Sequence, residues 1–596
     1  MKDFVKMTLA VICGLFIMSI ISFFLMIGFF GSLAATGSTS GKTVLPREGI
    51  LKMDLSTLSI VEQPEIGFSS FSSLQSGMTG VSLWKAVQAI NAAAADPSVK
   101  MIYLKADGSG MSLAATEEVR KALENFRLSG KPVIAWTESP GTGSYWLSSV
   151  ADKVYMSSAA GAGPMMTGVG TRLIFLKDIL DKFGVNVQLI RHGKYKSAGE
   201  MYIRSTPSPE NLEQNQVMIN SIWSSISQAV EESRSLEPGT LTAMIDNLSL
   251  SSSKDMLESG LVDLLLSKEE MRLKIAQLAG KESFSDVKFI QFADYADAKV
   301  LPKLKADKEI AIIFANGSIV EGDDPKAISG DRFATMISEI RKDDKVKAVV
   351  FRVNSPGGSV LASDKIKNEI DLLRKEKPVI ASYGDYAASG GYWISNSCDH
   401  IFTDRTTLTG SIGVFSMIPD LSKTAKDVLH VGVTSVGSSK HSDMFSGTRP
   451  LDKDELAYMQ ASIEDIYGKF VGTVAEGRGI EPEYVDSIAQ GRVWTGAESV
   501  DLKLTDAIGT LEDAVKYAAI VVSGGDPDLS GWAINGYPAE LSPMETILAM
   551  IQEKTTGDTD VLAGTPFSGI ERAFKGWDFN SSEKVFARMP YQYEIK

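Results

Sequence analysis

YGDYAASGGYWISNSCDHIFTDRTTLTGSIGVF, residues 383–415, is the most informative stretch of this 596-residue sequence. Ser389 lies near its start among small residues, which would let another backbone approach closely. Tyr392, Trp393 and further apolar residues follow, and they predict a buried helix that begins at or near the serine. The free N–H groups of such a helix end would suit a nucleophile whose attack creates an oxyanion. Taken alone, the stretch is more typical of a small-residue turn under a helix, so the remaining sequence has to distinguish the two.

The sequence outward from this stretch is duplicated. KPVIA at 131–135 recurs at 377–381, and VKMIYLK at 99–105 resembles VKAVVFR at 346–352. The two copies are about 247 positions apart in both cases, and a spacing that steady indicates a repeat. We therefore predict that the body of the chain is a tandem duplication of one structural unit.

Apolar strands and amphipathic helices alternate within each unit. Residues 310–315 and 348–353 are typical of strands buried on both faces, and residues 379–382 of the strand that follows them. Between these strands, residues 363–375 carry apolar side chains at helical spacing. Strands that alternate with helices favour parallel βαβ units. The predicted fold class is therefore α/β.

The length of the chain predicts at least two domains, since one hydrophobic core rarely serves so many residues. The repeat and the composition divide the chain into four parts. These are an N-terminal transmembrane anchor at 1–34, a first repeat at 44–280, a second repeat at 309–520 and a C-terminal extension at 521–596.

Composition excludes several classes of function. A net charge of -14 argues against a nucleic-acid-binding protein, which would carry a basic face. Cys13 lies in the apolar N-terminal run, which leaves Cys398 as the only cysteine of the body. A disulfide framework or a cysteine-based zinc site cannot be built from one cysteine.

The N-terminal segment predicts a membrane anchor. Residues 7–30 contain no charge, and as a helix they would span roughly 36 Å, enough to cross a bilayer. Lys2 and Lys6 precede the run and the next positive residue is Lys42, which places the N-terminus in the cytoplasm and the body outside it. We expect the anchor to be retained, although residues 32–34 form a passable cleavage site.

Backbone groups near the serine could complete a reaction centre. Gly357 and Gly358 follow a buried strand, and their N–H groups, with that of Gly390, could bind an oxyanion. The alternative is a strand-to-helix turn that needs only the conformational freedom of glycine.

A serine nucleophile needs a base, and a lysine is the candidate. His400 lies 11 positions after Ser389, at the end of the expected helix and far from its start. Lys196 follows an apolar strand-like run at 185–190 and is followed by small residues. Burial could hold a lysine in the neutral form that a base requires. On its own, Lys196 is more typical of a solvated surface charge.

Four motifs together resemble one known family. They are YKSAGEMYIR at 195–204, SPGGS at 355–359, YAASGGYWIS at 386–395 and LTGSIGVF at 408–415. In this order they resemble the long, duplicated form of the signal peptide peptidase A family, membrane-anchored serine–lysine proteases of family S49. The resemblance covers the body from about 44 to 520 and implies two tandem crotonase- and ClpP-like repeats after a transmembrane helix.

The resemblance also implies a role for each site residue. Ser389 would be the nucleophile, Lys196 the general base from the first repeat, and Ser411 the residue that orients the lysine amine. Gly390, Gly358 and Gly357 would supply the oxyanion N–H groups. No cofactor or metal is implied. The implied assembly is a homotetrameric bowl in the inner membrane with a periplasmic body, and the implied substrates are remnant signal peptides.

Two positions leave alternatives open. Lys440 occupies in the second repeat the place that Lys196 occupies in the first, and single-unit relatives take their lysine from that segment. Lys440 is therefore an alternative base. Thr142 holds the place of Ser389 in the first repeat, and we expect that half-site to be structural, although Thr142 could be a weak nucleophile paired with Lys440.

Two other functions compete with a peptidase. One is an acyl-CoA hydratase or isomerase on the same fold, which the predicted extracytoplasmic placement argues against. The other is a catalytically silent oligomeric scaffold that binds peptides, since the first repeat has lost its serine without losing its pattern.

Overall fold

The computed structural model describes residues 45–63, 78–301, 306–539 and 585–589, together with Gly14, Met18 and Ile21. Most of the predicted anchor at 7–30 and residues 540–584 of the predicted extension lie outside these ranges. Among the described residues, no helix combines the length and the apolar character that a membrane crossing requires. The anchor stays a prediction from the sequence.

Six parallel strands form the sheet of the first unit. Their order is β8 (Leu264–Leu266), β6 (Lys153–Ser157), β5 (Val133–Thr137), β4 (Val99–Lys105), β1 (Gly49–Asp54) and β9 (Phe289–Gln291). Helices α3 (Leu83–Ala95) and α4 (Leu113–Leu128) share one apolar core with this sheet. Each helix begins at a serine whose hydroxyl accepts a hydrogen bond from the first turn, as the capping preference of serine predicts.

The second unit repeats these six strands within an eight-stranded sheet that also contains β17 (Leu408–Gly410) and β19 (Val493–Thr495). The corresponding strands are β20 (Ala507–Ile508), β16 (His400–Thr403), β15 (Val379–Ala388), β13 (Val346–Ser355), β10 (Lys308–Asn316) and β21 (Trp532–Tyr537), again all parallel. The predicted strands at 310–315, 348–353 and 379–382 fall within β10, β13 and β15. The predicted helix at 363–375 falls on α14 (Val360–Arg374). The α/β class is confirmed.

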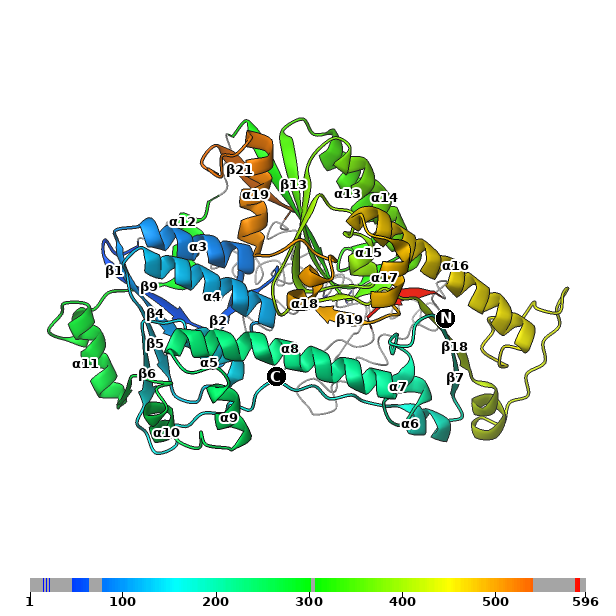
Figure 1. The fold of residues 1–596 in the computed structure, drawn as a ribbon, viewed down its shortest axis with the longest axis horizontal. Helices are drawn as coiled ribbons and strands as arrows, with labels where there is room; N and C mark the ends of the chain where they lie inside the picture. Colours follow the sequence, from blue (N-terminus) through cyan, green and yellow to red (C-terminus); the bar gives the residue numbers. More distant parts are fainter. Residues whose placement is uncertain are drawn as a thin grey trace.

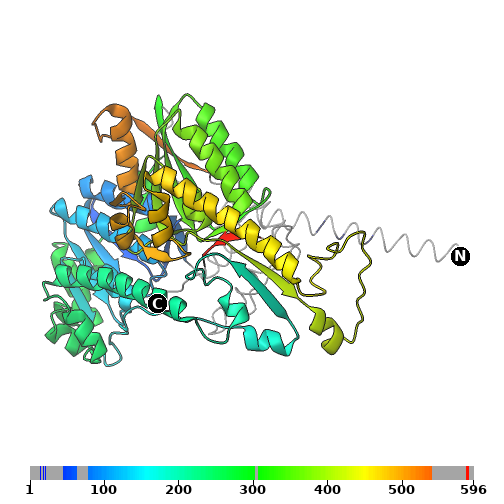
Figure 2. The same cartoon turned by 45° about the vertical axis from the view of Figure 1, so that its right-hand side comes forward.

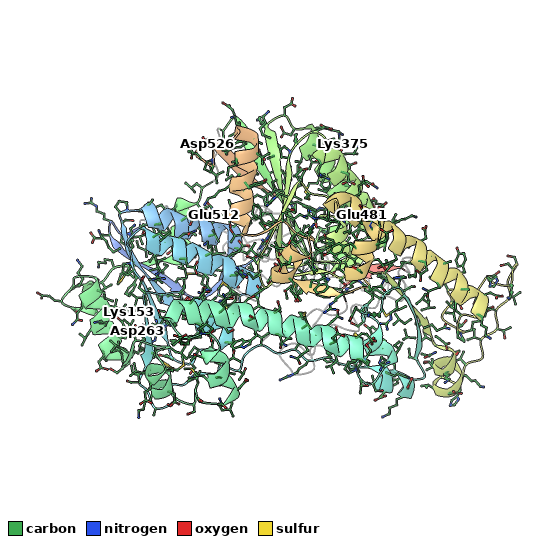
Figure 3. The ribbon with its side chains drawn as sticks, viewed as in Figure 1. Lys153, Asp263, Lys375, Glu481, Glu512 and Asp526 are labelled. Atoms are coloured by element: carbon green, nitrogen blue, oxygen red, sulfur yellow. The ribbon has the colours of Figure 1, made fainter. Side chains whose placement is uncertain are left out.

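Corresponding residues also make corresponding hydrogen bonds. Asp263 accepts the Val154 N–H at 2.8 Å, and Asp506 accepts the Ile401 N–H at 2.8 Å. Lys153 pairs with Asp263 at 3.0 Å, and Figure 3 shows these two side chains together at the edge of the first unit. Pairing of this kind at equivalent places supports an origin by duplication beyond the similarity of sequence.

One local prediction was wrong and another was confirmed in part. The expected Gly-Gly turn is a short strand, β14 (Gly357–Ser359), in a separate sheet. The buried helix predicted at the serine is present as α15 (Gly390–Trp393), but it has only four residues and ends well before His400. Ser395 and Asn396 bond to backbone carbonyls one turn back, at Gly391 and Trp393, and such local bonds compete with helix propagation.

A third sheet joins the two units. Its order is β12 (Ile328–Ser329), β11 (Ile319–Val320), β14, β22 (Phe586–Arg588), β18 (Phe415–Asp420) and β7 (Asn186–Arg191). The antiparallel pairing of β7 with β18 runs from Arg191 opposite Phe415 to Asn186 opposite Asp420. Figure 2 shows these two strands side by side in an arm that extends from the body. The pairing brings a loop of the first unit against the second.

A long helix follows each of the two arm strands, β7 and β18, along the chain. Helix α8 (Pro209–Arg234) runs from the arm back along the first unit, and α16 (Lys453–Arg478) does so along the second (Figure 1). Each helix has 26 residues, and their common length reflects the duplication.

A buried ion cluster also connects the units. Arg352 on β13 lies 2.7 Å from Glu118 on α4 and 2.6 Å from Glu62, and its side chain is 1% exposed. A buried charge of this kind is tolerated only when its partners are in place. The two repeats are therefore held together by paired charges as well as by packing.

Candidate active site

Ser389 lies between β15 and α15 in an unusual backbone conformation. Its φ is 56° and its ψ is -114°, a conformation that residues with a side chain rarely adopt. The Ser389 N–H donates to the carbonyl oxygen of Gly410 at 2.8 Å, and the residue is fully buried. Strain at a buried polar residue indicates that the surrounding structure holds the hydroxyl in one required position.

Lys196 comes from the loop after β7 and meets this hydroxyl. Its Nζ lies 2.8 Å from Ser389 Oγ, 3.0 Å from Ser411 Oγ and 3.0 Å from the Ser411 carbonyl oxygen. The lysine is 0% exposed. Burial lowers the pKa of Lys196 well below its usual value, because an ammonium group loses its hydration there. A lysine held in the neutral form can accept a proton from a neighbouring hydroxyl.

The loop after β7 that carries Lys196 is fixed by the close approach of the Gly491 backbone. A Cβ on Gly491 would lie 2.6 Å from the backbone nitrogen of Lys196, so only glycine fits there. The Tyr195 N–H donates to the Gln490 carbonyl at 3.0 Å, which ties the same loop to the second unit. Gln214 of α8 adds a bond from its Nε2 to the Tyr195 carbonyl at 3.1 Å.

Ser411 follows β17 (Leu408–Gly410), which pairs in parallel with the end of β15. Its N–H donates to the Arg492 carbonyl at 2.7 Å, next to β19 (Val493–Thr495), and its φ is 50°. Ser411 thus presents both its hydroxyl and its carbonyl to one amine. Two acceptors in fixed positions orient the lone pair of that amine towards Ser389.

Two of the three predicted glycine N–H groups lie close together beside Ser389. A Cβ on Gly390 would lie only 3.0 Å from the Gly358 nitrogen, so the two amides are close neighbours beside Ser389. The Gly357 N–H instead donates to Ser355 Oγ at 3.1 Å. Gly357 is therefore not available as a donor, and we assign this part of the site to Gly358 and Gly390.

Comparison with known proteins identifies the family. The sequence model of peptidase family S49 matches residues 125–282 and 371–523, one segment in each unit. Protease 4 of Salmonella typhi is 35% identical over 543 residues, which cover 87% of this chain and 84% of that protein. The chain belongs to peptidase family S49. It is a serine protease, and the competing scaffold and acyl-CoA functions are set aside.

Other relatives of this S49 peptidase extend over most of its length. Protease 4 of Haemophilus influenzae is 33% identical and covers 74% of this chain and 73% of its own. The chloroplastic serine protease SPPA of Arabidopsis thaliana is 29% identical and covers 86% of this chain and 74% of its own. These matches confirm the resemblance to the long, duplicated form. A solved ClpP1 structure from Listeria monocytogenes is 14% identical, and the match covers 34% of this chain and 93% of that chain. Its TM-score of 0.24 is too low to establish a shared fold.

The structure of this S49 peptidase places Lys440 away from Ser389. The Lys440 amine pairs with Asp454 at 2.9 Å, and its side chain is 65% exposed. The hydrogen bond that Lys440 donates to the Asp454 carboxylate raises the pKa of Lys440. An exposed and paired ammonium is the opposite of what a base requires. His400 packs against Phe402 on β16, outside the site as expected.

One buried carboxylate behind the lysine had no predicted role. Glu200 is fully buried at the start of α7 (Glu200–Ile203) and accepts hydrogen bonds from Ser208 Oγ at 2.8 Å and from Arg191 at 3.2 Å. The same Arg191 donates to the Lys196 carbonyl at 2.6 Å. The pair holds the lysine loop from behind. The available signal was a lone carboxylate in the small and apolar run SAGEMYI at 197–203.

Proposed function

We propose that this S49 peptidase is a membrane-anchored endopeptidase that works through a Ser389–Lys196 dyad on remnant signal peptides. One observation carries the proposal. The Lys196 amine lies 2.8 Å from the Ser389 hydroxyl, and both residues are fully buried. A neutral amine at this distance is the base that a serine nucleophile needs.

The reaction follows from this geometry. Ser389 Oγ attacks the peptide carbonyl carbon while Lys196 Nζ takes the hydroxyl proton. The N–H groups of Gly358 and Gly390 bind the oxyanion, and each such donor typically contributes about 3 kcal/mol to transition-state stabilisation. Lys196 then gives its proton to the leaving amine. Water enters, loses a proton to the same lysine, and releases the acyl group from Ser389.

The substrate class rests on the predicted anchor and on the relatives. An anchor at 7–30 with an extracytoplasmic body would hold the site beside the inner membrane, where cleaved signal peptides remain. Relatives carry the names Protease 4 and SPPA. A homotetramer with its sites facing inward, as the resemblance implies, would limit access to short, extended peptides.

Peptidase activity of four proteins tests the dyad. We would compare wild type, Ser389→Ala, Lys196→Ala and Lys440→Ala as full-length proteins in detergent, with a fluorogenic apolar peptide and a fluorophosphonate label. We expect Ser389→Ala and Lys196→Ala to lose turnover and Lys440→Ala to retain it. Loss of turnover in Lys440→Ala alone would reject Lys196 as the base. Labelling of Ser389→Ala at the level of wild type would reject Ser389 as the nucleophile.

A further inference from the structure

A strand from the C-terminal extension lies in the candidate active site. Strand β22 pairs antiparallel with β14, with Ala587 opposite Gly358 and Arg588 opposite Gly357. On its other side it pairs with β18 through Phe586 and Phe415. The Met589 N–H donates to the Pro356 carbonyl at 2.7 Å, which continues the pairing.

The carbonyl group of Ala587 lies at the two assigned oxyanion donors. A Cβ on Gly390 would lie 2.9 Å from the Ala587 oxygen and 3.0 Å from the Gly358 nitrogen. A Cβ on Gly357 would collide with the same oxygen and lie 2.6 Å from the Gly390 nitrogen. The oxygen therefore shares a small volume with both amides, at the place that a scissile carbonyl would occupy.

Neighbouring side chains of β22 are held as a bound peptide would be. Ala587 is fully buried, so the space around it admits only a small side chain. The Phe586 ring lies 5.9 Å from the Phe415 ring. Met589 is 3% exposed and belongs to the core that contains Ala388 and Leu408 beside the site. An extended segment whose backbone pairs with a strand while its side chains lie in contacts on either side is how peptides bind at sheet edges.

We propose that the chain is its own substrate and that Ser389 cleaves it between Ala587 and Arg588. This inference rests on the proposed function, since it uses the same dyad. It extends that function by naming a cleaved bond and a substrate register, with a small residue before the bond and an aromatic residue before that.

The step is an ordinary acyl transfer. Ser389 Oγ bonds to the Ala587 carbonyl carbon as its proton passes to Lys196 Nζ. The bond between that carbon and the Arg588 nitrogen breaks, and Lys196 returns the proton to the new amine. Residues 588–596 leave as a peptide. Water hydrolyses the Ala587 ester, which leaves Ala587 as the new C-terminus and a free Ser389.

Cleavage would also open the site. With β22 in place, Ser389 and Lys196 are both 0% exposed, so an external peptide has no room beside them. Loss of residues 588–596 removes the two pairings that hold Arg588 and Met589 to β14 and Pro356. A shortened strand keeps fewer hydrogen bonds and is displaced more easily.

Intact-mass spectrometry of the full-length protein tests the inference. We expect purified wild type to lose the mass of residues 588–596 and Ser389→Ala to retain it. The same samples are assayed for hydrolysis of a fluorogenic apolar peptide. Wild type that cleaves the external peptide yet keeps its C-terminus overturns this inference and leaves the proposed function standing. Wild type that cleaves neither overturns both. Loss of the segment from Ser389→Ala as well, or cleavage at a different bond, overturns the inference.

A matched pair at Ala587 sharpens the test. Ala587→Trp cannot fit the fully buried position, so we expect at least a tenfold slower loss of the segment. Ala587→Ser keeps a small side chain and should be processed like wild type. Both substitutions lie outside the dyad. A tryptophan that does not fit keeps the strand out of the site and a processed serine variant has lost it, so both variants should take up the fluorophosphonate label. Equal processing of the two variants would overturn the assigned register.

Discussion

Thr142 and Ser389 occupy equivalent places in the two repeats, yet only Ser389 lies beside a lysine amine. Thr142 begins α5 (Thr142–Ser148), and its Oγ1 donates to the Gly168 carbonyl at 3.1 Å and accepts the Thr167 N–H at 3.2 Å. Ser389 Oγ instead faces the Lys196 amine at 2.8 Å. The same fold can therefore use one hydroxyl to hold a loop and the other to meet a base.

The lysines of the two repeats, Lys196 and Lys440, differ in burial. Lys196 of the first repeat is buried against the second, whereas Lys440 of the second repeat is exposed and paired with Asp454. Burial lowers the pKa of Lys196, and the hydrogen bond that Lys440 donates to Asp454 raises the pKa of Lys440. The first repeat thus supplies the buried lysine, and the second repeat supplies the serine that this lysine contacts.

Substitution of each lysine by methionine should give the largest difference in peptidase activity between the two repeats. General-base catalysis and amine positioning typically contribute about 10²–10⁴-fold, so we expect kcat of Lys196→Met to fall by at least about 10³-fold. Lys440→Met should stay within about twofold of wild type, since the residue is exposed. Steady-state hydrolysis of an apolar peptide at one pH measures both. Similar losses of kcat in the two variants would contradict the assignment of Lys196, and not Lys440, as the base.

Arg352 and Lys105 hold equivalent strand positions and should differ in stability. Arg352→Ala leaves Glu118 buried without its partner, so we expect the free energy of unfolding to fall by about 3–5 kcal/mol. Lys105 is 32% exposed and pairs with Asp54 at 3.1 Å. Lys105→Ala should therefore cost less than about 1 kcal/mol. Urea unfolding curves compare them, and equal shifts would contradict a structural role for the buried cluster.

Lys196 should make both activity and stability depend on pH. Its pKa is lower in the folded protein than in the unfolded chain, where it is near 10.5. Between the two values the unfolded chain binds more protons, so the free energy of unfolding rises with pH across that window. Peptidase activity should rise in the same direction, because only the neutral amine accepts a proton. Thermal unfolding of wild type and Lys196→Met over this window checks the sign, and an unchanged slope in the variant would refute it.

Loss of the Thr142 hydroxyl should have the smallest effect. Thr142→Val removes two partly buried hydrogen bonds, so we expect about 1–2 kcal/mol lower stability. Peptidase activity should remain within about twofold, while Ser389→Ala in the same assay serves as the inactive reference. A large loss of activity in Thr142→Val at temperatures where the variant is folded would show that the first half-site takes part in the reaction.

Much of the fold and the site could be predicted from local pattern. The strands β10, β13 and β15 and helix α14 follow from apolar runs and helical spacing, which act over a few residues. Ser389 and its glycine neighbours stand out because small residues cluster there. The resemblance led to Ser411 and Lys196 through motifs. Glu200 received no role, since its partners Arg191 and Ser208 meet it only in the folded loop.

The sequence by itself determined the duplication, the α/β class and the place of the serine, because these depend on short-range periodicity and residue size. Only the tertiary structure decided which lysine is buried, that Gly357 is already bonded, and that β22 lies against β14. The burial of one lysine and the place of β22 depend on pairings between segments hundreds of residues apart, such as β7 with β18. The Gly357 bond is local, but it depends on the backbone conformation that turns its N–H towards Ser355 Oγ. Burial is a property of the assembled sheets, and a lysine gains or loses its charge according to burial.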